Sequence, residues 1–299
     1  MNQKLGRKRR DAAWQQSHLH GWGHDRKKML KLSSETLYAF GVLSNVFHEV
    51  MFLHKALQAT APREGAADHI VAAHICQTMT LVRILAGKIW EARTRMNDKT
   101  LSRVLREQFF PLRPGHADQW KQLSRYINAA PWLATLRNNH AFHYPTFEQI
   151  GPALRANWPT GGGTVLGLST GNCFFLEADQ ALMLSFFEAA QAGPVGDKVQ
   201  LIRAFGDVLS ALYGMSTTLT TLLVELLADF VERRVWDGEA TLPLGEVESP
   251  SYESIVLPYF VLPNGTSDRF SVTATSASLA SGQRGGQRAR AARGRNRRS

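Results

Sequence analysis

The sequence predicts a mainly α-helical bundle that carries a small β-hairpin. Two segments in the first third of the chain, and a third segment before residue 237, repeat apolar residues at the three- and four-residue steps of a buried helix face. Residues 164–177 have the composition of two short strands joined by a turn. A chain of 299 residues is long enough to bury a sizeable core.

The net charge of +10 is carried by the two ends of the chain. Residues 1–31 contain nine Lys and Arg against two Asp, and residues 269–299 contain eight Arg and no acid. The segment between them is therefore mildly acidic. We expect a basic, disordered arm over residues 1–32, a helical domain over 33–237, an extended segment that packs on it over 238–266, and a disordered Arg/Gly-rich tail over 267–299.

The first two helices have the clearest signals. Ser33 or Ser34 can cap a helix that starts with Glu35 and ends before Pro62. His54 lies on the apolar face of this helix, where a buried and hydrogen-bonded histidine is expected. The second helix, over residues 66–96, has two interleaved rows of residues spaced by seven, which favours packing along a neighbouring antiparallel helix. These rows are Val71, Thr78, Leu85 and Ala92, and Ile75, Val82, Ile89 and Met96.

Shorter elements follow. Asp98 can cap a helix over residues 99–110, and further helices are predicted over 117–129 and 131–143. A hairpin is predicted near 164–177, with its turn at residues 169–172. Helices resume over 178–191 and 197–236, and Gly206 and Gly214 allow the last one to be kinked or divided.

The two cysteines, Cys76 and Cys173, lie far apart in the sequence and fit neither a disulfide framework nor a zinc site. We therefore expect a reducing, cytoplasmic location and no metal or cofactor. The apolar stretch from residue 219 to residue 231 contains Glu225 and Asp229, so we interpret it as a buried helix of a soluble protein, without a membrane partner.

One short stretch concentrates groups that can hold phosphate and transfer protons. Residues 136–145 read LRNNHAFHYP and contain Arg137, Asn138, His140 and His143 within seven positions. Pro145 disfavours helix for the residue before it, so we expect the helix that carries these groups to end near His143. A guanidinium suits a phosphate group, and a histidine suits proton transfer near neutral pH.

This stretch resembles the signature motif of the HEPN superfamily, in which an Arg, commonly followed by Asn, Asp or His, precedes a His by four to six residues. Here Asn138 follows Arg137, and five residues separate Arg137 from His143. The segment from Gly87 to Glu91 and the pair Tyr144–Pro145 also look like HEPN-type proteins. The helix layout over residues 34–236 agrees with the resemblance, whereas the motif itself covers about ten residues.

The resemblance implies a helical bundle that forms a homodimer and brings two motifs together in one cleft. It implies a metal-independent endoribonuclease of a toxin–antitoxin or antiviral defence system, with RNA as substrate and an antitoxin or regulatory protein as a further partner. By the same resemblance Arg137 would hold the scissile phosphate, His143 would act as general acid or base, and Asn138 would orient one of them. Glu91 matches the acidic position of an earlier helix; its other interpretation is a solvated carboxylate paired with Arg95.

The spacing of the motif does not decide which histidine works with Arg137. At about 100° per residue, positions 137 and 143 fall about 120° away from a common helix face. Either His143 lies past the helix end, or Arg137 and His143 meet across a dimer, or His140 is the working partner of Arg137.

Two functions therefore follow from the sequence. The first is the endoribonuclease. The second is a non-catalytic HEPN-like RNA-binding or scaffold protein that uses its basic tails, because Arg/Gly-rich tails bind RNA electrostatically.

Overall fold

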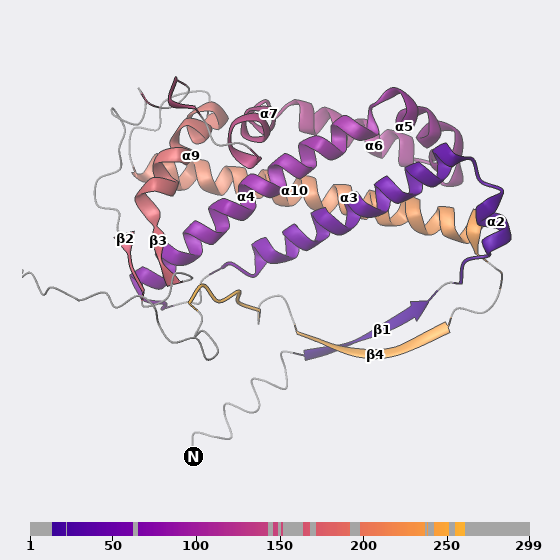
Figure 1. Ribbon diagram of the computed structural model, residues 1–299, viewed down its shortest axis with the longest axis horizontal. Coiled ribbons are helices and arrows are strands. Elements are labelled where there is room, and N and C mark those ends of the chain that lie inside the picture. The colour runs from indigo at the N-terminus through magenta and orange to yellow at the C-terminus, as the bar shows by residue number, and fades with distance from the viewer. Residues whose placement is uncertain are drawn as a thin grey trace, which may run out of the picture.

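Three long helices, α3 (Ser34–Gln58), α4 (Asp68–Met96) and α10 (Lys198–Phe230), form the body of the protein in the computed structural model (Figure 1). The structure describes residues 14–21, 23–61, 65–142, 146–148, 164–167, 172–191, 198–236, 242–250 and 255–260, together with Gly151 and Gly238. Helix α10 packs against both α3 and α4, and α3 packs against α4. The mainly helical fold class predicted from the sequence is confirmed.

The predicted signals of α3 and α4 explain how the core is built. The Ser33 side chain accepts a hydrogen bond from the Thr36 backbone N–H, which caps α3. The C-terminal members of both seven-residue rows of α4 are buried against the rest of the bundle: Val82, Leu85, Ile89, Ala92 and Met96. His54 of α3 is half-buried, less than expected, and it is hydrogen-bonded as expected: its Nδ1 lies 2.7 Å from the Ser216 Oγ of α10.

The middle of the chain forms a series of short helices that pack across the long ones. Helix α5 (Lys99–Val104), capped by Asp98, continues as the π-helix η1 (Leu105–Phe109) and the 3₁₀ turn η2 (Phe110–Leu112). Helix α6 (His116–Asn128) packs on α10, and α7 (Trp132–Leu136) packs on α4 and α9. Helix α7 passes directly into a second π-helix, η3 (Arg137–Ala141), which contains the polar motif.

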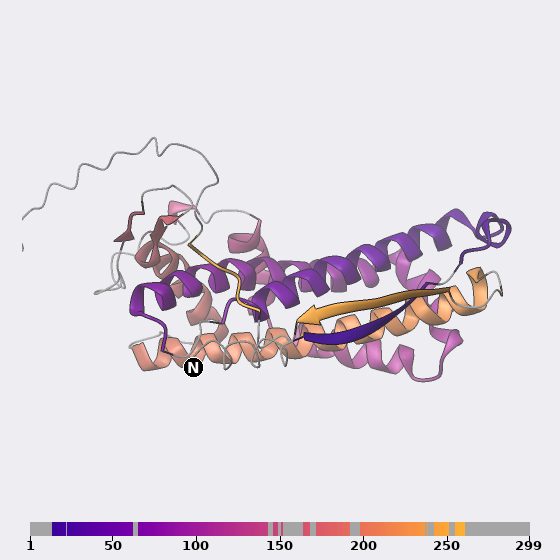
Figure 2. The same ribbon diagram turned by 90° about the horizontal axis from the view of Figure 1, so that it is seen from below.

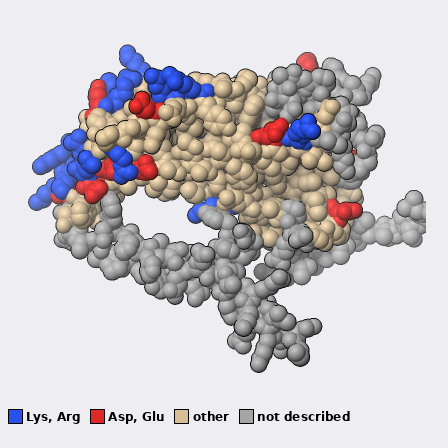
Figure 3. Space-filling view, turned by 180° about the vertical axis from the view of Figure 1, so that it is seen from behind, with Lys and Arg blue, Asp and Glu red and all other residues tan. Residues whose placement is uncertain are grey.

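Helix α9 (Leu176–Gln191) and α10 complete the bundle. Gly206 and Gly214 do not divide the last helix, because α10 is continuous for 33 residues and continues as a third π-helix, η5 (Val231–Val235). Helical glycines are tolerated here because α10 buries a long apolar side against four other helices, α3, α4, α6 and α9. Charged side chains gather at the end of the bundle near α2 and α5, and the middle of the face in Figure 3 is largely uncharged.

The predicted hairpin is present as strands β2 (Thr164–Val165) and β3 (Phe174–Phe175), which pair antiparallel at the end of the bundle where α4 begins. Phe174 is buried, and it packs against Ala73 and Cys76 of α4. The hairpin is thus stabilised by the helical body, as two short strands require. The predicted turn lies mostly outside the described residues.

The expectation of an unstructured N-terminal arm over residues 1–32 was wrong for the part that the structure describes. Strand β1 (Trp14–Gly21) pairs antiparallel with β4 (Leu242–Pro250), and the ribbon runs along one side of the helices (Figure 2). Helix α2 (Arg26–Leu30) follows, with Asp25 as its cap. Proline is tolerated in β4 because each strand of a two-stranded ribbon has an unpaired edge.

Residues 255–260 return to the body of the protein. The Leu257 backbone N–H donates to the Ala59 carbonyl oxygen at 2.6 Å, just after the end of α3. The Gln77 side chain of α4 donates to the Pro258 carbonyl oxygen at 3.4 Å, so the segment also lies against the N-terminal half of α4.

Three helical segments have the length and apolar composition that a membrane-spanning helix needs: Ser34–Gln58, Asp68–Met96 and Ile202–Val235. The last of these includes residues 219–231, for which Glu225 and Asp229 predicted a buried helix of a soluble protein. The expectation of a cytoplasmic protein without a membrane partner therefore stays a prediction.

Candidate functional site

The contact between α4 and η3 builds the candidate site, and Gly87 makes this contact possible. A Cβ atom on Gly87 would lie 2.7 Å from the Ala141 Cβ and 2.9 Å from the Phe142 Cε2. Only a residue without a side chain lets the two backbones approach this closely. The contact aligns η3 along α4, so that residues of the motif lie beside the charged side chains one helical turn before and after Gly87.

Arg137 lies beside Glu91, the acidic residue that the resemblance singled out. The Arg137 Nη2 donates to the Glu91 Oε1 at 3.3 Å, and the Arg137 Nη1 donates to the Asn138 Oδ1 at 3.1 Å. The two charged side chains are 37% and 38% exposed, respectively, so the guanidinium is oriented but still accessible. Glu91 therefore pairs with Arg137, in place of the Arg95 partner that was the other interpretation.

His140 occupies a different environment from Arg137. Its side chain is buried, and burial, with a smaller contribution from the Arg83 charge, lowers the pKa of His140 to about 4. The π-helix explains the inward direction, because i→i+5 hydrogen bonding puts more residues in each turn and moves His140 off the face of Arg137. A buried imidazole that is neutral at pH 7 is poorly suited to donate a proton to a substrate.

His143 lies outside the described residues, as do Tyr144 and Pro145. Of the five predicted site residues, the structure thus brings Arg137, Asn138 and Glu91 together, directs His140 into the bundle, and leaves His143 unplaced. Phe142, the last described residue before His143, is 42% exposed, and the Lys88 Nζ lies 5.8 Å from the centre of its ring. Phe142 therefore lies at the surface of the protein.

A groove of about 380 Å³ between α3 and α4 adjoins the Arg137–Glu91 pair. Glu91 itself lines the groove, together with Lys88, Arg95 and Glu49, and the Lys88 Nζ lies 3.0 Å from the Glu49 carboxylate. Sequence reasoning missed Lys88 and Arg95 as site residues, although their spacing from Glu91 on one helix was visible. The arrangement places three cations and two carboxylates along one wall of the bundle.

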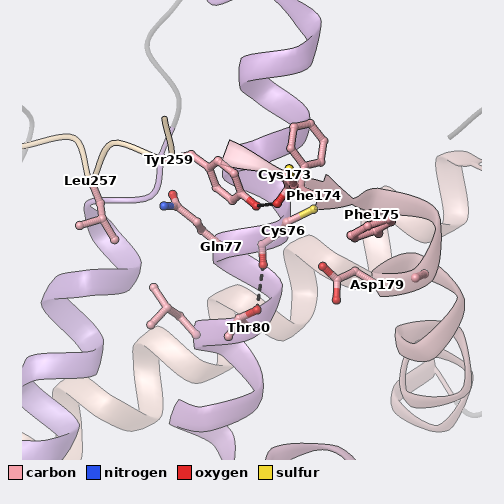
Figure 4. A pocket seen from close by; sticks show the side chains of 11 residues that line it. Cys76, Gln77, Thr80, Cys173, Phe174, Phe175, Asp179, Leu257 and Tyr259 are labelled. Atoms are coloured by element: carbon pink, nitrogen blue, oxygen red, sulfur yellow. Dashed lines mark hydrogen bonds between the residues drawn. The ribbon is translucent and has the colours of Figure 1, made fainter. Parts of the chain in front are cut away.

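A second cavity lies near the start of α4 and had no signal in the sequence. It contains both cysteines, from α4 and from the residue before β3, and the carboxylate of Asp179 of α9 (Figure 4). Cys76 and Cys173 are reduced. Within the described ranges, no cluster of three or more His, Cys, Asp or Glu side chains has the geometry to hold a metal ion.

Comparison of the chain with protein families, with curated proteins and with solved structures finds no match.

Proposed function

We propose that this chain is a metal-independent endoribonuclease whose site is centred on Arg137. The observation that carries the proposal is the half-exposed Arg137 guanidinium, which Glu91 and Asn138 orient beside a groove that also contains Lys88 and Arg95. Arginine has five N–H donors, so a guanidinium with two of them engaged can still bind a phosphate oxygen pair.

The chemistry needs no group beyond the chain and the RNA. The ribose 2′-oxygen attacks the adjacent phosphorus, the bond to the 5′-oxygen of the next nucleotide breaks, and a 2′,3′-cyclic phosphate and a 5′-hydroxyl result. Arg137 would neutralise the charge on the phosphorane, and His143 would transfer the proton. Glu91 would act as a positioning residue for Arg137. The low pKa of His140 favours His143 over His140 for proton transfer.

Cleavage of a fluorescent RNA by the purified protein tests the proposal. We expect Arg137→Ala and His143→Ala to abolish cleavage while circular dichroism and melting temperature stay unchanged, and EDTA to have no effect. Arg125→Ala, which removes an exposed arginine of α6, is the matched control and should cleave normally. Equal cleavage by the wild type and both site variants would remove the proposal.

The resemblance also suggests how the activity is used. We propose a cytoplasmic homodimer that acts as a toxin or in antiviral defence, with an antitoxin or other regulatory protein as partner. Expression of the wild type, but not of Arg137→Ala, should then arrest growth. Sedimentation should give a dimer, and cell fractionation should leave the protein in the soluble fraction.

The pairing of Arg137 with Glu91 and the burial of His140 also favour a second candidate, a non-catalytic RNA-binding or scaffold protein. In that case RNA association would depend on the basic tail, which lies outside the described residues. Deletion of residues 267–299 should then abolish binding and flatten its dependence on salt. Cleavage that survives this deletion would favour the enzyme.

A further inference from the structure

The cavity at the start of α4 is separate from the Arg137 groove. Its volume is about 570 Å³, within the range of small-molecule sites in proteins. Cys76 and Gly87 lie 11 positions apart on α4, which corresponds to about 16 Å along a helix axis. Four segments form the walls: α4, the residues around β3, the start of α9, and residues 255–260.

The walls of the cavity are held in place by contacts between segments distant in sequence. The Tyr259 hydroxyl donates to the Cys173 carbonyl oxygen at 2.7 Å, as Figure 4 shows. The rings of Phe174 and Tyr259 meet edge to face, with centroids 5.4 Å apart, and Phe260 packs against both. A cavity with walls fixed in this way needs little rearrangement to accept a ligand.

Asp179 is the only charged side chain among the described residues that line the cavity. Its Oδ1 forms a long ion pair with the Arg83 Nη2 at 3.8 Å, a distance beyond that of a good hydrogen bond. The Cys76 thiol also faces this carboxylate: burial, together with the charge of Asp179 and a side-chain hydrogen bond to it, raises the pKa of Cys76 to about 12. The thiol thus stays protonated and can donate to Asp179, while the carboxylate keeps acceptor capacity toward the cavity.

We propose that this cavity binds an apolar organic cation, an amine that carries an aryl or alkyl group. The ammonium would donate to the Asp179 carboxylate, and the apolar part would lie against Phe174, Tyr259 and Leu81. Aromatic rings beside a carboxylate favour a cation over a neutral or anionic molecule of the same shape, because both the ring faces and the carboxylate attract positive charge.

Binding of three probes of similar shape to the full-length protein tests the charge preference. The probes are 2-phenylethylamine, 2-phenylethanol and 3-phenylpropionate, measured by ligand-observed NMR and calorimetry at pH 7. We expect the amine to bind about tenfold or more tighter than the alcohol, as a hydrogen bond to a charged group predicts, and the acid to bind weakest. Asp179→Asn should reduce the preference for the amine to about twofold or less.

A second variant keeps the test decisive if Asp179→Asn unfolds the protein. Ala178 lines the cavity and is exposed, so Ala178→Phe fills the space without removing a core side chain. This variant should lose binding of all three probes and keep its melting temperature. Asp118→Asn, which changes an exposed carboxylate of α6, is the matched control and should bind as the wild type does.

Cys173 provides an independent readout, because it lines the cavity and the chain has only one other cysteine, the buried and protonated Cys76. Occupancy by the amine should slow alkylation of Cys173 by iodoacetamide, whereas the same concentration of the alcohol should not. The proposal is overturned if the amine and the alcohol bind equally, if no probe binds, or if amine binding survives in both Asp179→Asn and Ala178→Phe.

Discussion

Gly87 lies against the ring of Phe142, so that a single added Cβ atom would sit 2.9 Å from the Phe142 Cε2. This close approach of α4 and η3 determines where Arg137 lies relative to Glu91. The position of the polar motif therefore depends on a residue that has no side chain and takes no part in the proposed chemistry.

Gly87→Ala should separate α4 from η3 and disturb the Arg137–Glu91 pair. Because both atoms nearest the new Cβ belong to a packed contact, we expect a loss of about 1–3 kcal/mol in the free energy of unfolding, together with reduced RNA cleavage. Gly206→Ala is the matched control, because nothing lies within 4 Å of its added Cβ. That change should stabilise α10 by about 0.5–1 kcal/mol. Urea unfolding measures both, and equal effects of the two substitutions would contradict this role of Gly87.

Glu91→Gln should reduce RNA cleavage by weakening the orientation of Arg137. The pair is more than one-third exposed on both sides, so its loss should change the free energy of unfolding by less than about 1 kcal/mol. A fall in cleavage rate without a fall in stability separates a positioning role from a structural one. Glu107→Gln, which breaks the exposed Arg103–Glu107 pair of α5 and η1, should affect neither quantity. A large loss of stability in Glu91→Gln would show that the pair is structural.

Burial of His140 should make the protein less stable in mild acid. The folded-state pKa of about 4 lies below the ordinary value of 6.5, so the unfolded chain binds a proton between these pH values and the folded chain does not. Stability is then fully present above pH 6.5 and falls as the pH drops toward 4, by up to about 3 kcal/mol from this residue.

Urea unfolding at pH 7.5 and pH 5 compares His140→Gln with His48→Gln, a change of an exposed histidine on α3. We expect the wild type and His48→Gln to lose similar amounts of stability in acid and His140→Gln to lose clearly less. His54, whose pKa burial also lowers, contributes equally to all three proteins. The same acid dependence in all three would contradict a buried neutral His140.

Arg113→Met should lower the melting temperature strongly. Asp229 of α10 is buried, and its Oδ1 accepts from the Arg113 Nη2 at 2.8 Å, so removal of the arginine leaves a buried carboxylate without its cation. Arg103→Met removes an arginine whose partners Glu35 and Glu107 are exposed, and it should change little. Differential scanning calorimetry of the two variants measures the contrast, and equal melting temperatures would argue against this role of Asp229.

The sequence was sufficient to predict elements whose signals are local. The seven-residue rows of α4 and the cap at Ser33 lie within single helices, and both correspond to the structure. The pairing of β1 with β4 joins two segments that are far apart in the sequence, and neither strand has a strong pattern of its own. An interaction of this kind is visible only once the fold is known.

The candidate site likewise has features that the local sequence predicted and features that depend on the fold. The motif around Arg137 and the acidic residue Glu91 were predicted, because residue types and order are enough to resemble a known signature. The inward direction of the His140 side chain was not predicted. It depends on a π-helix, and the rotation of about 100° per residue in an α-helix does not apply there. The cavity of Cys76, Cys173 and Asp179 depends on tertiary contacts alone, so two distant cysteines appeared unrelated in the sequence.

Analysis of the ends of RNA fragments tests the central claim most directly. Purified wild-type protein, incubated with RNA in the presence of EDTA, should produce fragments with 2′,3′-cyclic phosphate and 5′-hydroxyl ends, which mass spectrometry identifies. Arg137→Ala and His143→Ala, prepared in the same way, should produce none. The proposal would be contradicted if either variant produced fragments of the same kind. It would also be contradicted if the RNA stayed intact with wild-type protein from which every regulatory partner had been removed.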